Sequence, residues 1–226
     1  MQSVDTDAQF VYNENGLRVK KTVNGVLTDY TLHGKNVVHM KRGDDELHFF
    51  YDAQNRPAVV VYNGTAYAYV KNLQGDIVAL LNGAGNVVVS YAYDAWGMPI
   101  GKSGSMAETL GTLNPFRYRG YVFDEETGLY YLRSRYYNPG WGRFVNADSY
   151  IGKMTMLSHN LFLYCHNSPI FRIDASGCED TTPAPTPSAL PQETPLPTPR
   201  PSRPENWRDI FTKLEIQNAI SNAVQK

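Results

Sequence analysis

Short runs of alternating apolar and polar residues, separated by turn-forming residues, fill the first part of this chain. The turn-forming residues recur every nine to twelve positions, at Gly16, Gly25, Gly34, Gly43, Asn55, Gly64, Gly75, Gly85 and Gly97. The β-branched and aromatic runs between them cover residues 17–23, 26–32, 47–51, 59–62, 65–70 and 87–93. Each run has the length of one strand, and this spacing is typical of antiparallel strands joined by tight turns. The pattern therefore predicts a series of β-hairpins.

Two dipeptides indicate how these strands pair. Asn24-Gly25 and Asn63-Gly64 each separate two runs, and both residue types tolerate the positive φ angles that a two-residue type I′ turn requires. We therefore expect each strand to pair with its neighbour in sequence. In residues 65–70 the order Ala-Tyr-Ala-Tyr places both tyrosines on one face and both alanines on the other. No segment before residue 107 combines a helical period with capping residues, so the first half is predicted to be all-β.

The pattern changes after Gly177. Nine of the 14 prolines and none of the 28 aromatic residues lie between Cys178 and Pro204, so this stretch lacks residues that form a core. We expect an extended, disordered linker over residues 178–204. Apolar residues then recur at helical spacing, which predicts one amphipathic C-terminal α-helix over residues 205–226. A lone helix cannot bury a catalytic core, so no separate catalytic domain is expected in this chain after residue 177.

Composition argues against several classes of function. The 21 basic and 22 acidic residues give a formal net charge of −1, which provides no broad field to attract phosphate backbones or anionic lipid. Nucleic acid and membrane surfaces are therefore not expected partners. No apolar run approaches the ~20 residues that span a bilayer, and the polar start lacks the basic and apolar regions of a signal peptide. The two cysteines, Cys165 and Cys178, form no disulfide framework, although one bridge between them remains open.

Several turns share one motif, and a longer stretch carries a second. Residues 12–18 read YNENGLR, residues 51–56 read YDAQNR and residues 93–97 read YDAWG. The Asp or Asn side chain of such a turn can accept a hydrogen bond from the backbone two residues on, while the glycine takes the left-handed conformation. These turns resemble the YD repeat. Residues 114–177 resemble the Rhs repeat-associated core, since they contain NPFRYRGY, DEETGLYYLRSRYYNP, GRF, NLFLY, NSP and DASG in that order.

The resemblance to Rhs/YD-repeat proteins implies a mainly β fold. YD-repeat hairpins over residues 1–106 would coil toward a hollow shell. An Rhs core over residues 107–177 would act as a plug, and the linker and the helix would follow it. In that family the segment after the core is a cargo, often a toxin, held inside the shell. The implied partners are the N-terminal remainder of the shell or another shell chain, and a C-terminal cargo polypeptide. The implied location is secreted or at the cell surface.

The resemblance also implies self-cleavage just past the core by two aspartates and an arginine. Asp148 and Asp174 stand where the family places its aspartates, and Arg135 stands at the arginine position. Hydrolysis by paired carboxylates needs one ionised Asp to take a proton from water and one protonated Asp to polarise the carbonyl. The cleaved bond is expected on either side of Cys178, at Gly177-Cys178 or at the next bond. The alternative is structural: aspartates that cap turns and an arginine stacked on tyrosines.

The histidines and one Arg-Gly-Asp tripeptide give weaker indications of a functional site. The histidines, His33, His39, His48, His159 and His166, show no paired spacing with cysteines or acids on one face, so no metal site and no cofactor are expected. Arg42-Gly43-Asp44 spells an adhesion tripeptide, but its position in the repeat predicts a plain hairpin tip.

Two further functions remain open. The chain could be a surface module that binds carbohydrate or protein through exposed tyrosine rings, or a truncated remnant without cargo. Several exposed tyrosines in a row would indicate the binding module, whereas rings buried between hairpins would indicate the shell.

The number of predicted hairpins is too small to enclose a cavity, and unpaired sheet edges are therefore expected.

Overall fold

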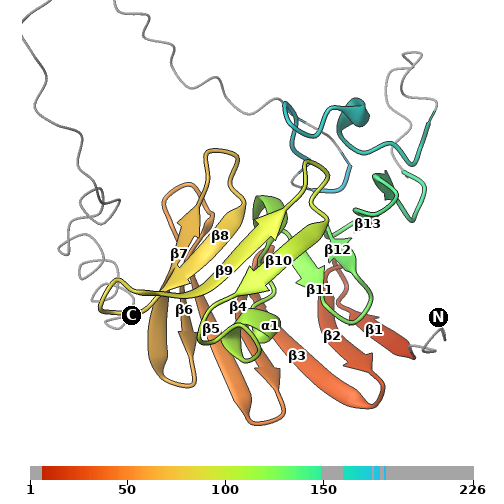
Figure 1. The fold of residues 1–226 in the computed structure, drawn as a ribbon. Helices are drawn as coiled ribbons and strands as arrows, with labels where there is room; N and C mark the ends of the chain where they lie inside the picture. The colour runs from red at the N-terminus through yellow and green to blue at the C-terminus, as the bar shows by residue number, and fades with distance from the viewer. Residues whose placement is uncertain (1–6, 149–159, 175, 179–180, 182–226) are drawn as a thin grey trace, which may run out of the picture.

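The structure, a computed structural model, describes residues 7–148, 160–174, 176–178 and 181. Ten strands form one antiparallel sheet in which each strand lies beside its neighbour in sequence (Figure 1). They are β1 (Ala8–Tyr12), β2 (Arg18–Val23), β3 (Val26–His33), β4 (Asn36–Arg42), β5 (Asp45–Tyr51), β6 (Pro57–Tyr62), β7 (Thr65–Lys71), β8 (Ile77–Leu81), β9 (Val87–Tyr93) and β10 (Pro99–Ser103). The sheet does not close, and β1 and β10 are its edges. The predicted β-hairpin fold with unpaired edges is confirmed.

The two-residue turns have the backbone that their type requires. Asn24 and Gly25 have φ angles of 50° and 80°, and β2 and β3 pair up to the residues that flank this dipeptide. Asn63 and Gly64 repeat the geometry between β6 and β7, with φ angles of 47° and 82°. Glycine and asparagine reach this region at low steric cost, so these dipeptides fix the register of both hairpins.

Five longer hairpin loops share a side-chain brace. In each, the Oδ1 atom of an Asp or Asn accepts hydrogen bonds of 2.8–3.0 Å from the backbone N–H groups two and four residues further on. The bracing residues are Asn13, Asp52, Asn72, Asn82 and Asp94. The turn geometry predicted from the YD motif is confirmed. It also occurs at Asn72 and Asn82, where no tyrosine precedes the bracing residue.

The tyrosines of the sheet, apart from the exposed Tyr12, pack in one cluster with residues that follow β10. In β7, Tyr67 and Tyr69 are buried, as the alternation of large and small residues predicted. Phe116 inserts among these rings, with its ring centroid 5.0 Å from that of Phe49 and 6.3 Å from that of Tyr69. The short helix α1 (Leu110–Leu113) buries Leu110 in the same cluster. The sheet and the segment after it therefore share one apolar core.

A second, four-stranded antiparallel sheet follows and packs on the β9–β10 turn (Figure 1). Its strands are β11 (Val122–Asp124), β12 (Leu129–Tyr131), β13 (Tyr136–Asn138) and β14 (Arg143–Phe144), and the 3-10 helices are η1 (Tyr118–Gly120) and η2 (Cys165–Asn167). Buried tyrosines reach the turn, since Tyr130 Oη donates to Gly97 O at 2.7 Å and Tyr137 Oη donates to Trp96 O at 2.8 Å. The second sheet is thus fixed to one end of the first.

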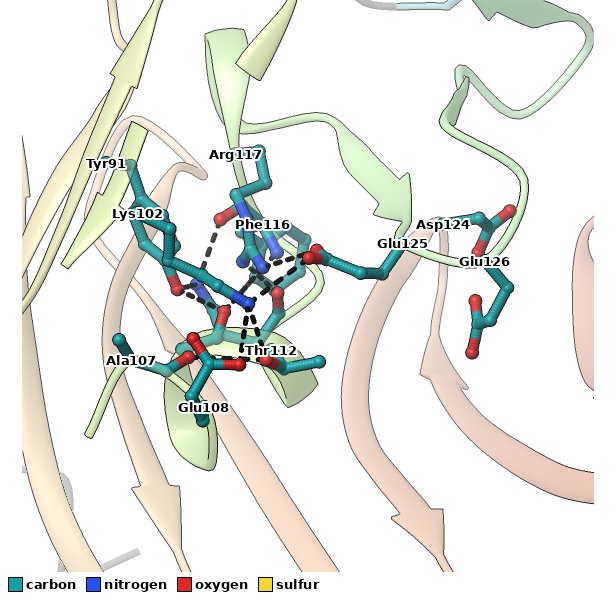
Figure 2. A network of polar contacts seen from close by, with 12 residues as sticks. Tyr91, Lys102, Ala107, Glu108, Thr112, Phe116, Arg117, Asp124, Glu125 and Glu126 are labelled. Atoms are coloured by element: carbon teal, nitrogen blue, oxygen red, sulfur yellow. Dashed lines mark hydrogen bonds and ion pairs between the residues drawn. The ribbon is translucent and has the colours of Figure 1, made fainter. Parts of the chain in front are cut away.

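Polar contacts hold the same segment against β9 and β10. Figure 2 shows the Lys102 ammonium of β10, which donates to Thr112 Oγ1 at 2.6 Å and lies 3.3 Å from Glu125 Oε1. Glu125 also pairs with Arg117 at 3.3 Å, and the Arg117 guanidinium lies 4.1 Å from the centroid of the Tyr91 ring. Because Arg117 is buried, these contacts compensate a charge that would otherwise be costly to desolvate.

A buried ion cluster attaches β11 to β2, near the other edge of the large sheet. Asp124 is fully buried and accepts hydrogen bonds from Arg18 at 2.5 and 2.9 Å and from Lys21 at 3.0 Å. Glu126 pairs with Lys21 at 2.7 Å and with Arg42 at 2.9 Å. Acids of the segment after β10 thus neutralise buried cations of the first hairpins. Contacts with both β2 and β10 place that segment across the inner side of the sheet.

Most of the chain expected to follow the core lies outside the described residues. This applies to the C-terminal helix and to the linker, apart from Cys178 and Thr181. The expected boundary between residues 106 and 107 falls in the connection from β10 to α1, and it stays a prediction. Among the helices that the structure describes, none has the length and apolar character needed to cross a membrane.

Candidate functional site

Arg135 lies in the connection between β12 and β13, with its side chain buried. The connection is a tight turn, in which Arg133 has a φ of 65° and the Leu132 N–H donates to Arg135 O at 2.9 Å. The guanidinium carbon of Arg135 lies 3.6 Å from the ring centroid of the buried Phe144 in β14. This cation–π contact fixes the plane of the guanidinium group and leaves its N–H edges available for other partners.

The Arg135 guanidinium brings together the two predicted aspartates. Its Nη1 atom lies 2.9 Å from Asp148 Oδ2, and its Nη2 atom lies 3.3 Å from Asp174 Oδ2. The Asp148 N–H donates to Leu161 O at 2.9 Å, and the same carbonyl accepts from Arg135 Nη1 at 3.2 Å. The structure therefore assembles the three residues that the sequence singled out, with the arginine between the carboxylates.

Asp174 also braces the turn that contains the expected cleavage position. Its Oδ1 atom accepts hydrogen bonds from the backbone N–H groups of Gly177 at 2.7 Å, Cys178 at 3.2 Å and Ser176 at 3.3 Å. Burial raises the pKa of the Asp174 carboxyl above its usual value, although the N–H groups and Arg135 act in the opposite direction. Asp174 therefore holds the turn and has a greater tendency to carry a proton than an exposed aspartate.

The Gly177 carbonyl points at Arg135 and accepts a hydrogen bond from its Nε atom. Gly177 has a φ of 74°, and a Cβ atom there would lie 2.6 Å from Leu132 O, so only glycine fits without displacement. Beyond the turn, Ile173 and Thr181 exchange backbone hydrogen bonds of 2.8 and 2.9 Å. Thr181 of the predicted linker therefore lies beside Ile173, close to the site.

The cysteines are free thiols, so the disulfide that the sequence left open is absent from the structure. Cys165 is buried, and Cys178 is partly exposed with its Sγ atom 3.1 Å from Ser134 Oγ. Ser134 also donates to Ser176 O at 2.7 Å. These contacts anchor both sides of the Gly177-Cys178 bond.

Three residues of the site were not predicted from the sequence. Ser134 holds the turn, Phe144 stacks on Arg135, and Tyr121 Oη accepts from the Asp174 N–H at 3.1 Å. All three lie within the core motifs that the sequence analysis quoted. The motifs place them in the right region, but the direction of each side chain depends on how the strands pack.

The prediction that no histidines lie with an acid on one face is wrong for the β4–β5 hairpin. His39 and His48 stand directly opposite each other in β4 and β5, and Glu46 lies on the same face, with its Oε1 atom 2.8 Å from His39 Nε2. Nine positions separate these two histidines along the chain, and only the pairing of β4 with β5 brings them together. His159 lies outside the described residues.

Tyrosine burial bears on the alternative of a glycan-binding surface. Among the tyrosines that the structure describes, Tyr12 is the only exposed one, at 42%. The others pack between the sheets or against the segment after β10, as in the two tyrosine-rich clusters. No row of exposed tyrosine rings occurs on the described part of the sheet, so the observation favours the shell.

Comparisons with known proteins agree with this architecture. A family model described as Teneurin YD-shell matches residues 37–170, a range that includes Arg135 and Asp148 and ends before Asp174. The tRNA3(Ser)-specific nuclease WapA of Bacillus spizizenii is 37% identical over 175 residues, which are 75% of this chain and 7% of that protein. Salivary gland surface protein 1 of Aedes aegypti is 41% identical over 93 residues, 41% of this chain and 2% of that protein.

A solved structure of TcdB2-TccC3-Cdc42 has a similar fold, with a TM-score of 0.62 and 20% identity over 78% of this chain and 9% of that chain. At this identity the likeness concerns the fold alone. The chain spans less than a tenth of the length of each of these three proteins.

Proposed function

Because this chain belongs to the Teneurin YD-shell family, we propose that it is a shell and plug segment of an Rhs-type toxin delivery protein. The larger protein would be secreted or displayed at the cell surface and would hold a C-terminal cargo polypeptide. The small share of its long relatives that this chain covers supports a role as one part of a shell. The buried tyrosines and the segment packed across the inner side of the sheet support a role in enclosure.

The edge of the ten-stranded sheet supplies a site for the rest of the shell. β1 lies at the edge, and its residues Val11 and Tyr12 are 52% and 42% exposed. An unpaired edge offers a row of backbone N–H and C=O groups to another strand. We assign this edge to a preceding hairpin of the shell or to a second shell chain.

We further propose that the Arg135 site cleaves the Gly177-Cys178 bond once per chain. The observation that carries this step is the Gly177 carbonyl, which accepts from the same guanidinium that bridges Asp148 and Asp174. That hydrogen bond polarises the carbonyl and would stabilise the oxyanion that forms when water adds to it. Its position selects the bond before Cys178 over the bond after it.

The two aspartates then have distinct roles. Asp148, as a carboxylate, takes a proton from the attacking water. Asp174 in its protonated form is the acid that gives a proton to the Cys178 nitrogen after water has added to the carbonyl. In the structure this nitrogen donates its own N–H to Asp174 Oδ1 at 3.2 Å, which keeps the two groups in contact. The carbon–oxygen bond forms, the carbon–nitrogen bond breaks, and the direct products are a Gly177 carboxylic acid, which then ionises in water, and a Cys178 amine. The proton from water is then on Asp148, and Asp174 is ionised. Cleavage would separate the plug from any cargo that follows it.

The test is the intact mass of the purified chain over time. We expect residues 178–226 to be released from the wild type and the Asp174→Asn variant to stay whole. Asp94→Asn is a matched control, because Asn13, Asn72 and Asn82 brace equivalent loops in this chain. A wild-type chain that keeps its full mass after prolonged incubation would reject self-cleavage and leave a structural shell segment.

The cleavage rate should depend on pH through Asp174. The proton-donating form of this carboxyl is present below its pKa, which burial raises, and it is lost as the pH increases through that value. We therefore expect faster cleavage at mildly acidic pH and a falling rate toward neutral pH. Single-turnover rates between about pH 4 and pH 8 would measure this. A rate that rises steadily toward alkaline pH would contradict the role of Asp174 as the acid.

A further inference from the structure

A cluster of metal-ligating side chains lies on the β4–β5 hairpin, outside the site described above. It consists of His39, Glu46 and His48, whose ligand atoms all lie within 4.8 Å of one another. We propose that this cluster binds one Zn²⁺ ion, or a similar divalent transition-metal ion. This inference is independent of the proposed shell and self-cleavage functions.

The hairpin register brings the three side chains to one face. The two-residue tip Gly43-Asp44 places His39 directly opposite His48, and Glu46 precedes His48 by two residues on the same strand. The opposite face of the hairpin carries buried apolar residues, with Leu47 fully buried. Burial of the apolar face therefore forces the three ligating residues to face away from the core, where solvent can deliver an ion.

Both imidazoles aim at the same carboxylate oxygen. Glu46 Oε1 lies 2.8 Å from His39 Nε2 and 3.7 Å from His48 Nε2, and the ring centroids of the histidines lie 4.6 Å apart. Ligands at about 2.1 Å from a tetrahedral zinc ion lie about 3.4 Å from each other. The distance from Glu46 Oε1 to His39 Nε2 is shorter than that value, and the distance to His48 Nε2 is longer. Small side-chain rotations therefore suffice to surround an ion. Such rotations are available because Glu46 and His48 are about half exposed.

A neighbouring strand supplies an orienting contact for His39. Thr31 lies opposite His39 in the pairing of β3 with β4, and its Oγ1 atom is 3.4 Å from His39 Nδ1. If the Nδ1–H donates to this hydroxyl, the Nε2 lone pair is free for the metal. Metal-binding histidines commonly have such a partner for their second nitrogen.

The ligand set selects the class of ion. Two imidazole nitrogens and one carboxylate oxygen suit zinc, nickel or copper, whereas magnesium and calcium prefer oxygen ligands throughout. Three protein ligands leave at least one coordination position for water. The structure thus assigns an open, solvent-facing transition-metal site to the outer face of the sheet.

Calorimetric titration with Zn²⁺ tests the proposal, using the full chain without a histidine tag and after chelator treatment. We expect one ion per chain, with binding weakened more than about 100-fold in His39→Ala and in His48→Ala, beyond the usual effect of an orienting partner. Thr31→Val should weaken binding about tenfold. His33→Ala is the matched control, since His33 is an exposed histidine of β3 outside the cluster, and it should bind as the wild type does.

Two outcomes would overturn the site. One is the absence of zinc binding by the wild type at micromolar concentrations. The other is zinc binding that persists in both histidine variants, in particular if Cys178→Ser removes it. Circular dichroism of each variant checks that the hairpins are still folded. That is the expected result, because Thr31 and His48 are exposed and His39 is partly exposed.

Discussion

Replacing Asp124 with alanine should lower the free energy of unfolding by about 3 to 5 kcal/mol, because it leaves a buried cation without its partner. Asp124 is fully buried and accepts two hydrogen bonds from Arg18, whose side chain is 1% exposed. Lys21 keeps Glu126 as a partner in the variant, but Arg18 loses its carboxylate. Urea denaturation with linear extrapolation measures the change.

The control for this prediction is Asp29→Ala. Asp29 pairs with Lys20 at 3.2 Å, and both side chains are about half exposed. An exposed pair contributes only about 0–1 kcal/mol, so this variant should be close to the wild type. A second variant, Asp124→Asn, tests the effect of the charge alone, because it keeps a hydrogen-bonding side chain of similar size but removes the carboxylate. If Asp124→Ala were no less stable than Asp29→Ala, the ion cluster would not hold the segment after β10 to the first hairpins.

Replacing Arg135 with lysine should slow cleavage by about 10²- to 10³-fold, the usual effect of removing one donor to a developing oxyanion. The guanidinium contacts Asp148, Asp174 and the Gly177 carbonyl through different nitrogen atoms. A lysine ammonium is a point charge on a flexible stem and cannot present this planar set of donors. The measurement is the single-turnover rate at which the intact mass disappears.

Arg143→Lys is the control for this variant. Arg143 lies in β14, and its guanidinium contacts the side chain of Asn167. The substitution alters an arginine of the same small sheet, so it should leave the cleavage rate close to that of the wild type. A wild-type rate in Arg135→Lys would show that the guanidinium does not act on the Gly177 carbonyl, even if the chain cleaves itself.

The candidate site was predicted from the sequence in part. The resemblance to the Rhs core located Arg135, Asp148, Asp174 and Gly177, and the structure brings them together. The motifs did not show that Arg135 lies between the two carboxylates, because 39 positions separate Arg135 from Asp174 along the chain. The contact depends on Phe144 and Tyr121, which position the guanidinium and the Asp174 backbone.

The cluster of His39, Glu46 and His48 can be derived from the sequence once the hairpin tip is located. The sequence indicated a hairpin tip at residues 42–44, and counting outwards from a two-residue tip pairs His39 with His48. The same count puts Glu46 on their face, because side chains alternate along a strand. The face that turns outwards is decided by the burial of Leu47 and its apolar neighbours.

By itself, the sequence determined the hairpins of this protein. Turn chemistry acts over five residues or fewer, so Asn24-Gly25 and the Asp52 and Asp94 braces can be read directly from the chain. The tertiary structure alone decided where the segment after β10 lies. Its anchors join residues far apart in sequence, such as Arg18 and Asp124, separated by 106 positions. Local propensity does not determine such pairs, because they form only when packing excludes water and makes an unpartnered charge costly.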